Sequence, residues 1–227
     1  MNETSFVRKL LSRINRLFLK LRGDSGPDLS RGPLSDLVRD AAVKALVEYT
    51  DDFCLEVGVG EGLLALAMKE RGIFRRFVGV DISTWNLFRA RKRLADDRYY
   101  HGVCAMAHRL PIRPGAIERV VCVNTLYNQR SWEEVRAIIL ELGQVTQNGG
   151  SFLFDIRNGR DPLITSVYRL SRIIDPSTRR LEIHAYPYRR VKRMLEEHGF
   201  YVQRRIRVHY PFWFIPSAYV IEAARII

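Results

Sequence analysis

Apolar residues recur along this chain with two periodicities, and their order predicts an α/β domain. Segments with helical spacing separate five short apolar runs, which lie at 53–57, 77–82, 99–104, 118–128 and 151–156. Strands that alternate with helices in this way are typical of a doubly wound, mostly parallel sheet. A helix from Tyr188 to His198 and two late strands, at 199–202 and 218–224, complete the pattern.

The helical segments have recognisable ends and faces. A helix is predicted from Leu34 to Tyr49, directly before the first strand, with an apolar side formed by Leu37, Val38, Ala41, Ala42, Leu46 and Val47. Ser131 and Glu134 form a capping box for a helix that runs to about Leu142. Gly159 to Pro187 is a long insertion between the fifth strand and the last helix.

The first 22 residues form a separate basic segment. Residues 5–22 place apolar side chains on one helical face and only cations on the other, namely Arg8, Lys9, Arg13, Arg16, Lys20 and Arg22. Such frequent charges disfavour a transmembrane helix, and the segment lacks the apolar core and cleavage site of a signal peptide. Three interpretations remain: a helix on an anionic membrane, a helix docked on the domain, or an organellar presequence. A linker rich in Gly, Pro and Ser follows at 23–33.

Composition bounds the class of protein. With 227 residues, of which 47% are hydrophobic, the chain resembles an ordinary globular protein, and we expect one domain over 34–227. The formal net charge of +12 indicates an anionic partner, which charge alone does not identify. Cys54, Cys104 and Cys122 lie in apolar runs without metal-ligand spacing, so we expect core thiols and no metal.

Three alternating glycines follow the first apolar strand. Gly58, Gly60 and Gly62 allow a sharp turn and a close approach of the backbone to a ligand, because no Cβ stands in the way. A G-x-G-x-x-G nucleotide fingerprint would need its third glycine at Leu63, and a P-loop would need a Gly-Lys-Ser/Thr ending that is absent here. Both phosphate-binding interpretations are therefore disfavoured.

An acidic residue ends the second strand. Asp81 lies about twenty residues after the glycine turn, where an α/β nucleoside site places a carboxylate against ribose hydroxyls. The alternative is that Asp81 caps the following helix, although Ser83 could fill that position equally well.

These motifs together resemble class I S-adenosylmethionine-dependent methyltransferases. The resemblance rests on Glu56 with the glycine turn, on Asp81, and on three later segments at 107–112, 124–127 and 148–156. The last segment matches the family's turn, at 148–150, and its fifth strand. It implies a mostly parallel seven-stranded sheet with one late antiparallel strand, and S-adenosyl-L-methionine as the cofactor. The donor-binding residues that it implies are Glu56, Gly58, Gly60, Gly62, Asp81, Ile82, Met106, Ala107 and Asn124.

Two departures from the family pattern bear on the ligands. Met106 stands where the family commonly has an acid that bonds the adenine amino group, so only backbone and apolar contacts remain there. The segment Asn124 to Tyr127 lacks the N/D-P-P-Y motif of methyltransferases that act on exocyclic amines. It is similar instead to the N-x-L-H/Y form of small-molecule and quinone methyltransferases.

The acceptor side of the site is less defined by the sequence. The resemblance implies that Asp155 and Asn158 point toward the acceptor. The candidates for a catalytic base are Tyr127, Asp155 and His108, together with His184 and His209, and the sequence does not rank them. The aromatic segment 209–216 is either core filling at the sheet edge, which we favour, or an apolar lid.

The resulting hypothesis is a cytoplasmic methyltransferase for an apolar or lipid-linked small molecule, peripheral at the inner face of the membrane through residues 5–22. The main alternative is an RNA methyltransferase whose phosphate contacts come from Arg179, Arg180, Arg189, Arg190, Lys192 and Arg193. A third reading is a donor-binding or scaffolding domain without catalysis.

Overall fold

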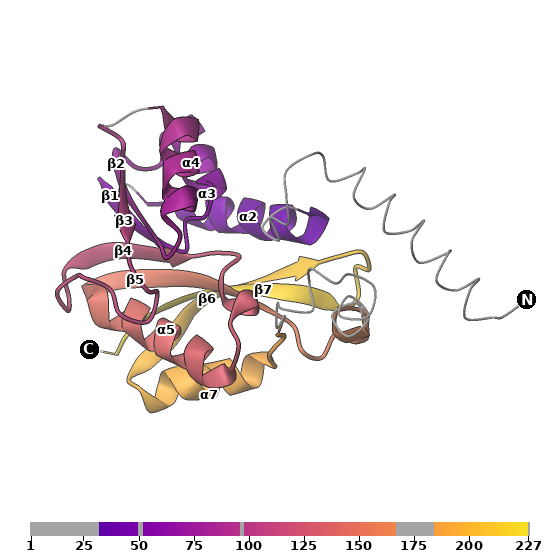
Figure 1. The fold of residues 1–227 in the computed structure, drawn as a ribbon. Helices are drawn as coiled ribbons and strands as arrows, with labels where there is room; N and C mark the ends of the chain where they lie inside the picture. The colour runs from indigo at the N-terminus through magenta and orange to yellow at the C-terminus, as the bar shows by residue number, and fades with distance from the viewer. Residues whose placement is uncertain (1–31, 50–51, 96–97, 167–183, 227) are drawn as a thin grey trace, which may run out of the picture.

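The computed structural model describes residues 32–49, 52–95, 98–166 and 184–226 (Figure 1). The basic segment 5–22, most of the linker, and Arg179 and Arg180 lie outside the described residues. The described strands are β1 (Phe53–Val57), β2 (Arg76–Asp81), β3 (Tyr100–Cys104), β4 (Ile117–Cys122), β5 (Thr146–Arg157), β6 (Phe200–His209) and β7 (Pro216–Arg225).

All seven strands form one sheet in the order β3-β2-β1-β4-β5-β7-β6. Neighbours from β3 to β5 pair in parallel, and β7 is antiparallel to both β5 and β6. The predicted sheet, mostly parallel with a late antiparallel strand, is therefore confirmed. The chain builds outward from β1 to β3 and then returns to β4, so the strand order reverses between β1 and β4. Ligands of open α/β sheets bind at the carboxyl ends of strands that flank such a reversal.

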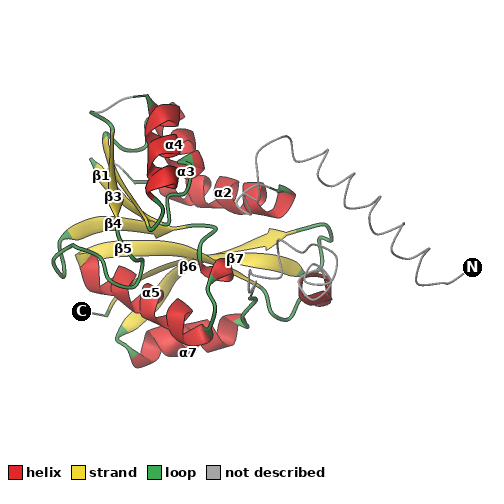
Figure 2. Ribbon diagram, viewed as in Figure 1, coloured by secondary structure: helices red, strands yellow, loops and turns green. Residues whose placement is uncertain are grey.

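Helices cover both faces of the sheet (Figures 1 and 2). One face carries α2 (Pro33–Leu46), α3 (Leu63–Glu70) and α4 (Thr84–Leu94), and the other carries α5 (Trp132–Val145) and α7 (Tyr188–Glu197). A short 3₁₀ helix, η1 (Leu126–Asn128), follows β4. Each helical layer packs its apolar side on the sheet and forms its own buried cluster. None of the helices that the structure describes combines the length and apolarity needed to cross a bilayer.

Several predicted boundaries are corrected. The helix α2 ends at Leu46 rather than Tyr49, and Leu37 and Val47, predicted on its apolar side, are exposed. The glycines predicted as a turn at 148–150 lie within β5, where the pairing shifts between Ile117 and Arg119 of β4. The last two strands each contain ten residues, so both are longer than the predicted ranges 199–202 and 218–224.

Two predicted helix starts are found with their caps. The Ser83 hydroxyl accepts a hydrogen bond from the Asn86 N–H at 3.3 Å, so Ser83 rather than Asp81 caps α4. The Ser131 hydroxyl likewise accepts from the Glu134 N–H at 3.2 Å. Of the cysteines, Cys54 and Cys122 are buried as expected, whereas Cys104 is exposed because β3 forms an edge of the sheet.

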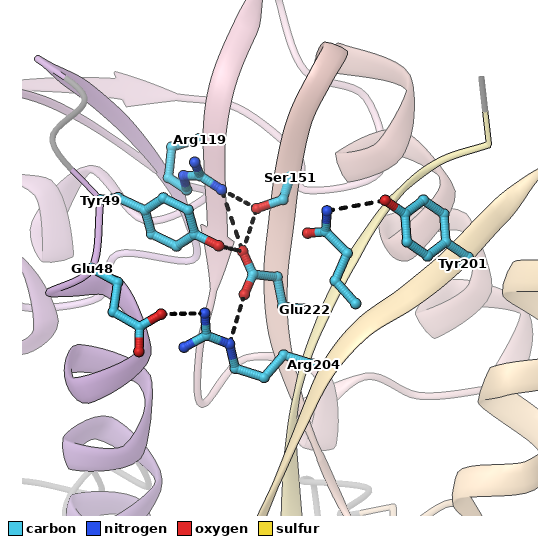
Figure 3. A network of polar contacts seen from close by, with 8 residues as sticks. Glu48, Tyr49, Arg119, Ser151, Tyr201, Arg204 and Glu222 are labelled. Carbon is cyan, nitrogen blue, oxygen red and sulfur yellow. Dashed lines mark hydrogen bonds and ion pairs between the residues drawn. The ribbon is translucent and has the colours of Figure 1, made fainter.

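A buried carboxylate joins the amino-terminal ends of the central strands. Glu222 of β7 is 1% exposed, and its Oε1 accepts hydrogen bonds from Tyr49, from Ser151 at 2.5 Å and from Arg119 at 3.3 Å (Figure 3). The guanidinium of Arg119 also lies 3.4 Å from the centre of the Tyr49 ring. The cluster therefore fastens the segment after α2 to β4, β5 and β7.

A second arginine extends the cluster to the sheet edge. Arg204 of β6 lies 3.4 Å from Glu222 Oε2 through Nε and 2.6 Å from Glu48 Oε2 through Nη2 (Figure 3). Removing one partner of a buried ion pair is costly, because the remaining charge stays desolvated and unpaired.

We expect Glu222→Ala to lower the free energy of unfolding by about 3–5 kcal/mol, because it leaves Arg119 buried without its carboxylate. Urea unfolding followed by circular dichroism measures this change. The matched control is Glu196→Ala, which breaks the exposed pair with Lys192 and should cost less than about 1 kcal/mol. Equal losses for the two variants would contradict this account of the cluster.

Candidate functional site

The three glycines form a tight turn between β1 and α3. Gly58, Gly60 and Gly62 have φ angles of 79°, 51° and 76°, a region that favours glycine. The backbone N–H of Gly58 donates to the Val80 carbonyl at 2.7 Å, which fastens the turn to the end of β2.

The surroundings of these glycines differ. A Cβ at Gly58 would lie 2.2 Å from Thr125 Oγ1, and one at Gly62 would lie 3.1 Å from Ala90 Cβ. A Cβ at Gly60 would meet nothing within 4 Å. Gly58 and Gly62 are therefore needed for packing, whereas Gly60 borders open space at the reversal of strand order.

Asp81 holds the turn from the neighbouring strand. Its Oδ2 accepts a hydrogen bond from the Gly60 N–H at 2.9 Å, and its Oδ1 accepts from the Ser83 N–H at 2.9 Å and from Asn86 Nδ2 at 3.2 Å. A carboxylate offers about four acceptor positions, so one remains on Oδ2. Asp81 thus fixes the backbone of the turn and can still accept a ligand hydroxyl beside Gly60.

Glu56 and Arg39 line one cleft at the turn. The cleft is bordered by both side chains and by Gly58, Gly60 and Asn124. Glu56 is 2% exposed, and its Oε2 has no hydrogen-bond partner among the described residues. Burial raises the pKa of Glu56 well above its usual value, and Asp81 raises it further while Arg39 opposes the shift. A carboxylate oxygen that is buried without a donor suits a cationic ligand group.

Two exposed apolar side chains stand at the ends of β2 and β3. Ile82 is 68% exposed and Met106 is 51% exposed, and these strands are neighbours in the sheet. Ala107 is half-buried and His108 is exposed. The pair could cover the two faces of a flat ring, because neither side chain is buried by the described protein.

Asn124, Asp155 and Tyr127 belong to a buried polar cluster around Arg157. Arg157 donates to Asp155 Oδ2 at 3.0 Å and to Asn124 Oδ1 at 2.7 Å, and its guanidinium lies 4.5 Å from the centre of the Tyr127 ring. The Asn124 amide reaches the Ser35 carbonyl at 3.0 Å, which ties the start of α2 to β4. These side chains are held among themselves, and Asn124 also borders the cleft.

The remaining candidates are spread around the carboxyl edge of the sheet. Asn158 is 3% exposed and donates from Nδ2 to the Pro216 carbonyl at 2.7 Å. His184 is half-buried, its backbone N–H donates to the Tyr127 carbonyl at 2.9 Å, and His209 is exposed on β6. The structure therefore brings together the predicted residues of the glycine turn. Of the candidate bases, Tyr127 and Asp155 share the buried cluster around Arg157 and the His184 backbone contacts Tyr127, whereas His108 and His209 are exposed away from that cluster.

The aromatic segment is a hairpin tip and not part of the core. Residues 210–215 connect β6 to β7, and the exposed fractions are 37% for Tyr210, 51% for Phe212, 83% for Trp213 and 58% for Phe214. The core-filling interpretation is thus wrong. The Asn158 contact with Pro216 places this aromatic tip at the carboxyl edge of the sheet, beside the end of β5.

Sequence reasoning missed three residues of the site. Arg39 lies on the predicted helix, Thr125 packs against Gly58, and Arg157 organises the buried cluster. The only available signal was position in the sequence. Thr125 directly follows Asn124 after the fourth strand, Arg157 lies two residues after Asp155 at the end of the fifth strand, and Arg39 lies on the helix before the first strand.

Comparisons with known proteins agree with this geometry. Residues 55–154 match the family described as a methyltransferase domain. The magnesium protoporphyrin IX methyltransferase of Synechocystis PCC 6803, solved with bound SAH, aligns with a TM-score of 0.67 at 17% identity, over 98% of this chain and 100% of that chain. A SAM-dependent methyltransferase of Methanosarcina mazei aligns with a TM-score of 0.65 at 17% identity, over 82% and 97%.

A further similar structure is a putative methyltransferase of Haloferax volcanii in complex with the Trm112 methyltransferase activator. It has a TM-score of 0.67 at 13% identity and covers 86% of this chain and 92% of that chain. No curated protein matches the sequence significantly.

The residues of the turn fit the methyl donor of this family. S-adenosylmethionine has ribose hydroxyls, a flat adenine and a cationic amino group, for which the turn offers Asp81 Oδ2, the apolar pair Ile82 and Met106, and Glu56 Oε2. Gly60 leaves the necessary space. The methyltransferase domain matched over residues 55–154, the sheet order and this fit together support a class I S-adenosylmethionine-dependent methyltransferase.

Proposed function

We propose that the turn between β1 and α3 binds the donor through two sets of contacts, one to its nucleoside and one to its amino acid end. Asp81 accepts a ribose hydroxyl on Oδ2, and Ile82 and Met106 flank the adenine. Glu56 and Arg39, which line one cleft, bind the oppositely charged amino and carboxylate groups at the amino acid end. Gly60 allows the backbone to approach the donor.

The donor supplies a methyl group activated by a sulfonium charge. The chain then has to align the acceptor with that methyl group and exclude water, and alignment of this kind is worth about 7–11 kcal/mol. Tyr127 and Asp155 are poorly suited as bases at neutral pH. Burial raises the pKa of Tyr127, and Asp155 already accepts hydrogen bonds from Arg157 and the Asn124 N–H.

The acceptor that we infer is an apolar or lipid-linked small molecule met at an anionic membrane surface. The observation that carries this proposal is the aromatic tip, residues 210–215, exposed at the edge of the sheet where acceptors bind. Trp and Tyr side chains favour the interface between lipid and water. Arg207 and His209 are exposed just behind the tip, and residues 5–22 would add further cations.

An RNA acceptor remains the alternative, because Arg189, Arg190, Lys192 and Arg193 are all exposed on α7. The aromatic tip favours the lipid proposal, since α7 offers no exposed ring on which a base could stack. Donor binding without methyl transfer to any cell fraction would correspond to a scaffolding role.

The acceptor class is tested with donor labelled on its methyl group and incubated with the full chain and a cell lysate. We expect the label in the lipid fraction. The triple variant Phe212→Ser, Trp213→Ser and Phe214→Ser should lose most of this incorporation and float about tenfold less with anionic liposomes, because it removes the apolar anchor.

Removal of residues 1–22 should also reduce flotation, through the loss of cations. Binding of S-adenosylhomocysteine should be unchanged in the triple variant, which serves as the control for folding. Label in the RNA fraction, or wild-type flotation in both variants, would contradict the proposal.

A second prediction concerns Glu56, whose folded-state pKa is raised by burial. A carboxyl group with a raised pKa opposes folding once the pH exceeds its usual value, about 4.3. Glu56→Gln should therefore raise the free energy of unfolding by about 0.5–2 kcal/mol at pH 7 and leave it unchanged near pH 4. The same variant should bind S-adenosylhomocysteine about tenfold more weakly.

Urea unfolding at the two pH values and calorimetric titration measure these effects. Equal stability of the two proteins at pH 7, or unchanged affinity, would show that Glu56 is not the buried acceptor described here.

A further inference from the structure

A hollow of about 380 Å³ between α5 and α7 is lined mainly by arginines. Arg136 comes from α5, and Arg189, Arg190 and Arg193 come from α7. All four are exposed, and Glu197 is the one carboxylate among the lining residues. The hollow therefore carries a concentrated positive charge that the donor site does not use.

These arginines are not neutralised by the surrounding protein. In the part of the chain that the structure describes, none of the four forms an ion pair with a carboxylate. Arg190 lies 4.3 Å from the centre of the Trp132 ring, and Arg136 Nη2 lies 2.7 Å from His198 Nε2. Ring stacking positions a guanidinium and leaves its N–H groups available to an anion.

The order of charges along α7 points the same way. The helix begins with Arg189 and Arg190 and ends with Glu196 and Glu197, which is the reverse of the order that the helix dipole favours. Pro187 at its start provides no side-chain cap, and the first turn has no acidic residue. An anion bound beside the first turn would satisfy the free N–H groups and compensate the clustered cations.

The start of this hollow lies near the carboxyl edge of the sheet. The Trp132 and Tyr186 rings have centroids 5.1 Å apart, and the Tyr186 N–H donates to the Arg157 carbonyl at the end of β5 at 2.9 Å. The aromatic tip extends from the same edge, because β5 and β7 are paired up to Ala218 (Figure 1). The cations of α7 and the exposed aromatic side chains can thus face one surface together.

We propose that the arginine hollow binds the phosphate of an anionic phospholipid headgroup when the aromatic tip lies in the bilayer interface. A guanidinium group can donate two parallel hydrogen bonds to the oxygens of one phosphate. One compact hollow suits a single headgroup phosphate better than the successive phosphates of a nucleic acid backbone. This inference rests on the proposed membrane location. It adds a specific site that orients the carboxyl edge toward the lipid.

The test uses the full chain with phosphatidylcholine vesicles that do or do not contain phosphatidylglycerol. The hollow variant carries the three substitutions Arg136→Gln, Arg189→Gln and Arg193→Gln in the arginine hollow. The control variant is Arg71→Gln, Arg75→Gln and Arg76→Gln, which removes the same charge from exposed positions at the opposite ends of the strands. We expect the hollow variant to lose at least about tenfold in affinity for phosphatidylglycerol vesicles, and the control variant to lose less than about threefold.

Two further measurements, competition by glycerol phosphate and an RNA gel shift, identify which molecule supplies the phosphate. Glycerol phosphate at high concentration should compete weakly, because it lacks the acyl chains that the tip engages. Tight binding of glycerol phosphate alone, or a hollow variant that loses affinity only for RNA in a gel shift, would overturn the lipid assignment. Equal losses of vesicle affinity in the hollow and control variants would show that net charge alone causes the effect, and would overturn the specific site.

The outcome for the proposed function is separate. Wild-type chain that binds phosphatidylcholine vesicles through the tip, with no response to phosphatidylglycerol, would overturn only the headgroup site. Wild-type chain that binds no vesicle would remove both the site and the membrane location.

Discussion

The hydrogen bond from the Gly60 N–H to Asp81 is the contact on which the donor site depends. It exists because β1 and β2 pair in parallel with Val57 opposite Val80, so that both strands end at one level. The turn after β1 then meets the carboxylate of Asp81, the last residue of β2, without any long connection. Backbone shape, open space and the remaining acceptor position on Asp81 all follow from this register.

Two buried ionic clusters hold the sheet on either side of that contact. The cluster around Arg157 binds the start of α2 to the carboxyl ends of β4 and β5, through Ser35, Asn124 and Asp155. The Glu222 cluster fastens the other end of the same helix to the amino ends of the strands. Both are expensive to desolvate, so their value is positional rather than a large net gain in stability. They keep Arg39, which lies between them on α2, over the cleft that contains Glu56.

Much of this arrangement could be predicted from the sequence because it is local. The glycine turn, Asp81 at a strand end and the Ser83 cap are each defined by a few neighbouring residues, and the family resemblance orders them. The Arg157 cluster could not be predicted in this way, since it joins Ser35, Asn124 and Asp155 across large separations. The exposure of the aromatic tip could not be predicted for a related reason. Alternating apolar residues do not reveal that β6 and β7 continue to His209 and Pro216 and carry the aromatic side chains away from the core.

Calorimetric titration of S-adenosylhomocysteine into the full chain tests the donor site most directly. The wild-type chain should bind with measurable heat. Gly60→Ala should bind at least about tenfold more weakly while keeping its fold by circular dichroism, since the new methyl group enters space that the protein leaves open. No heat with a folded wild-type chain, or full affinity in Gly60→Ala, would contradict the account of this turn as the donor site.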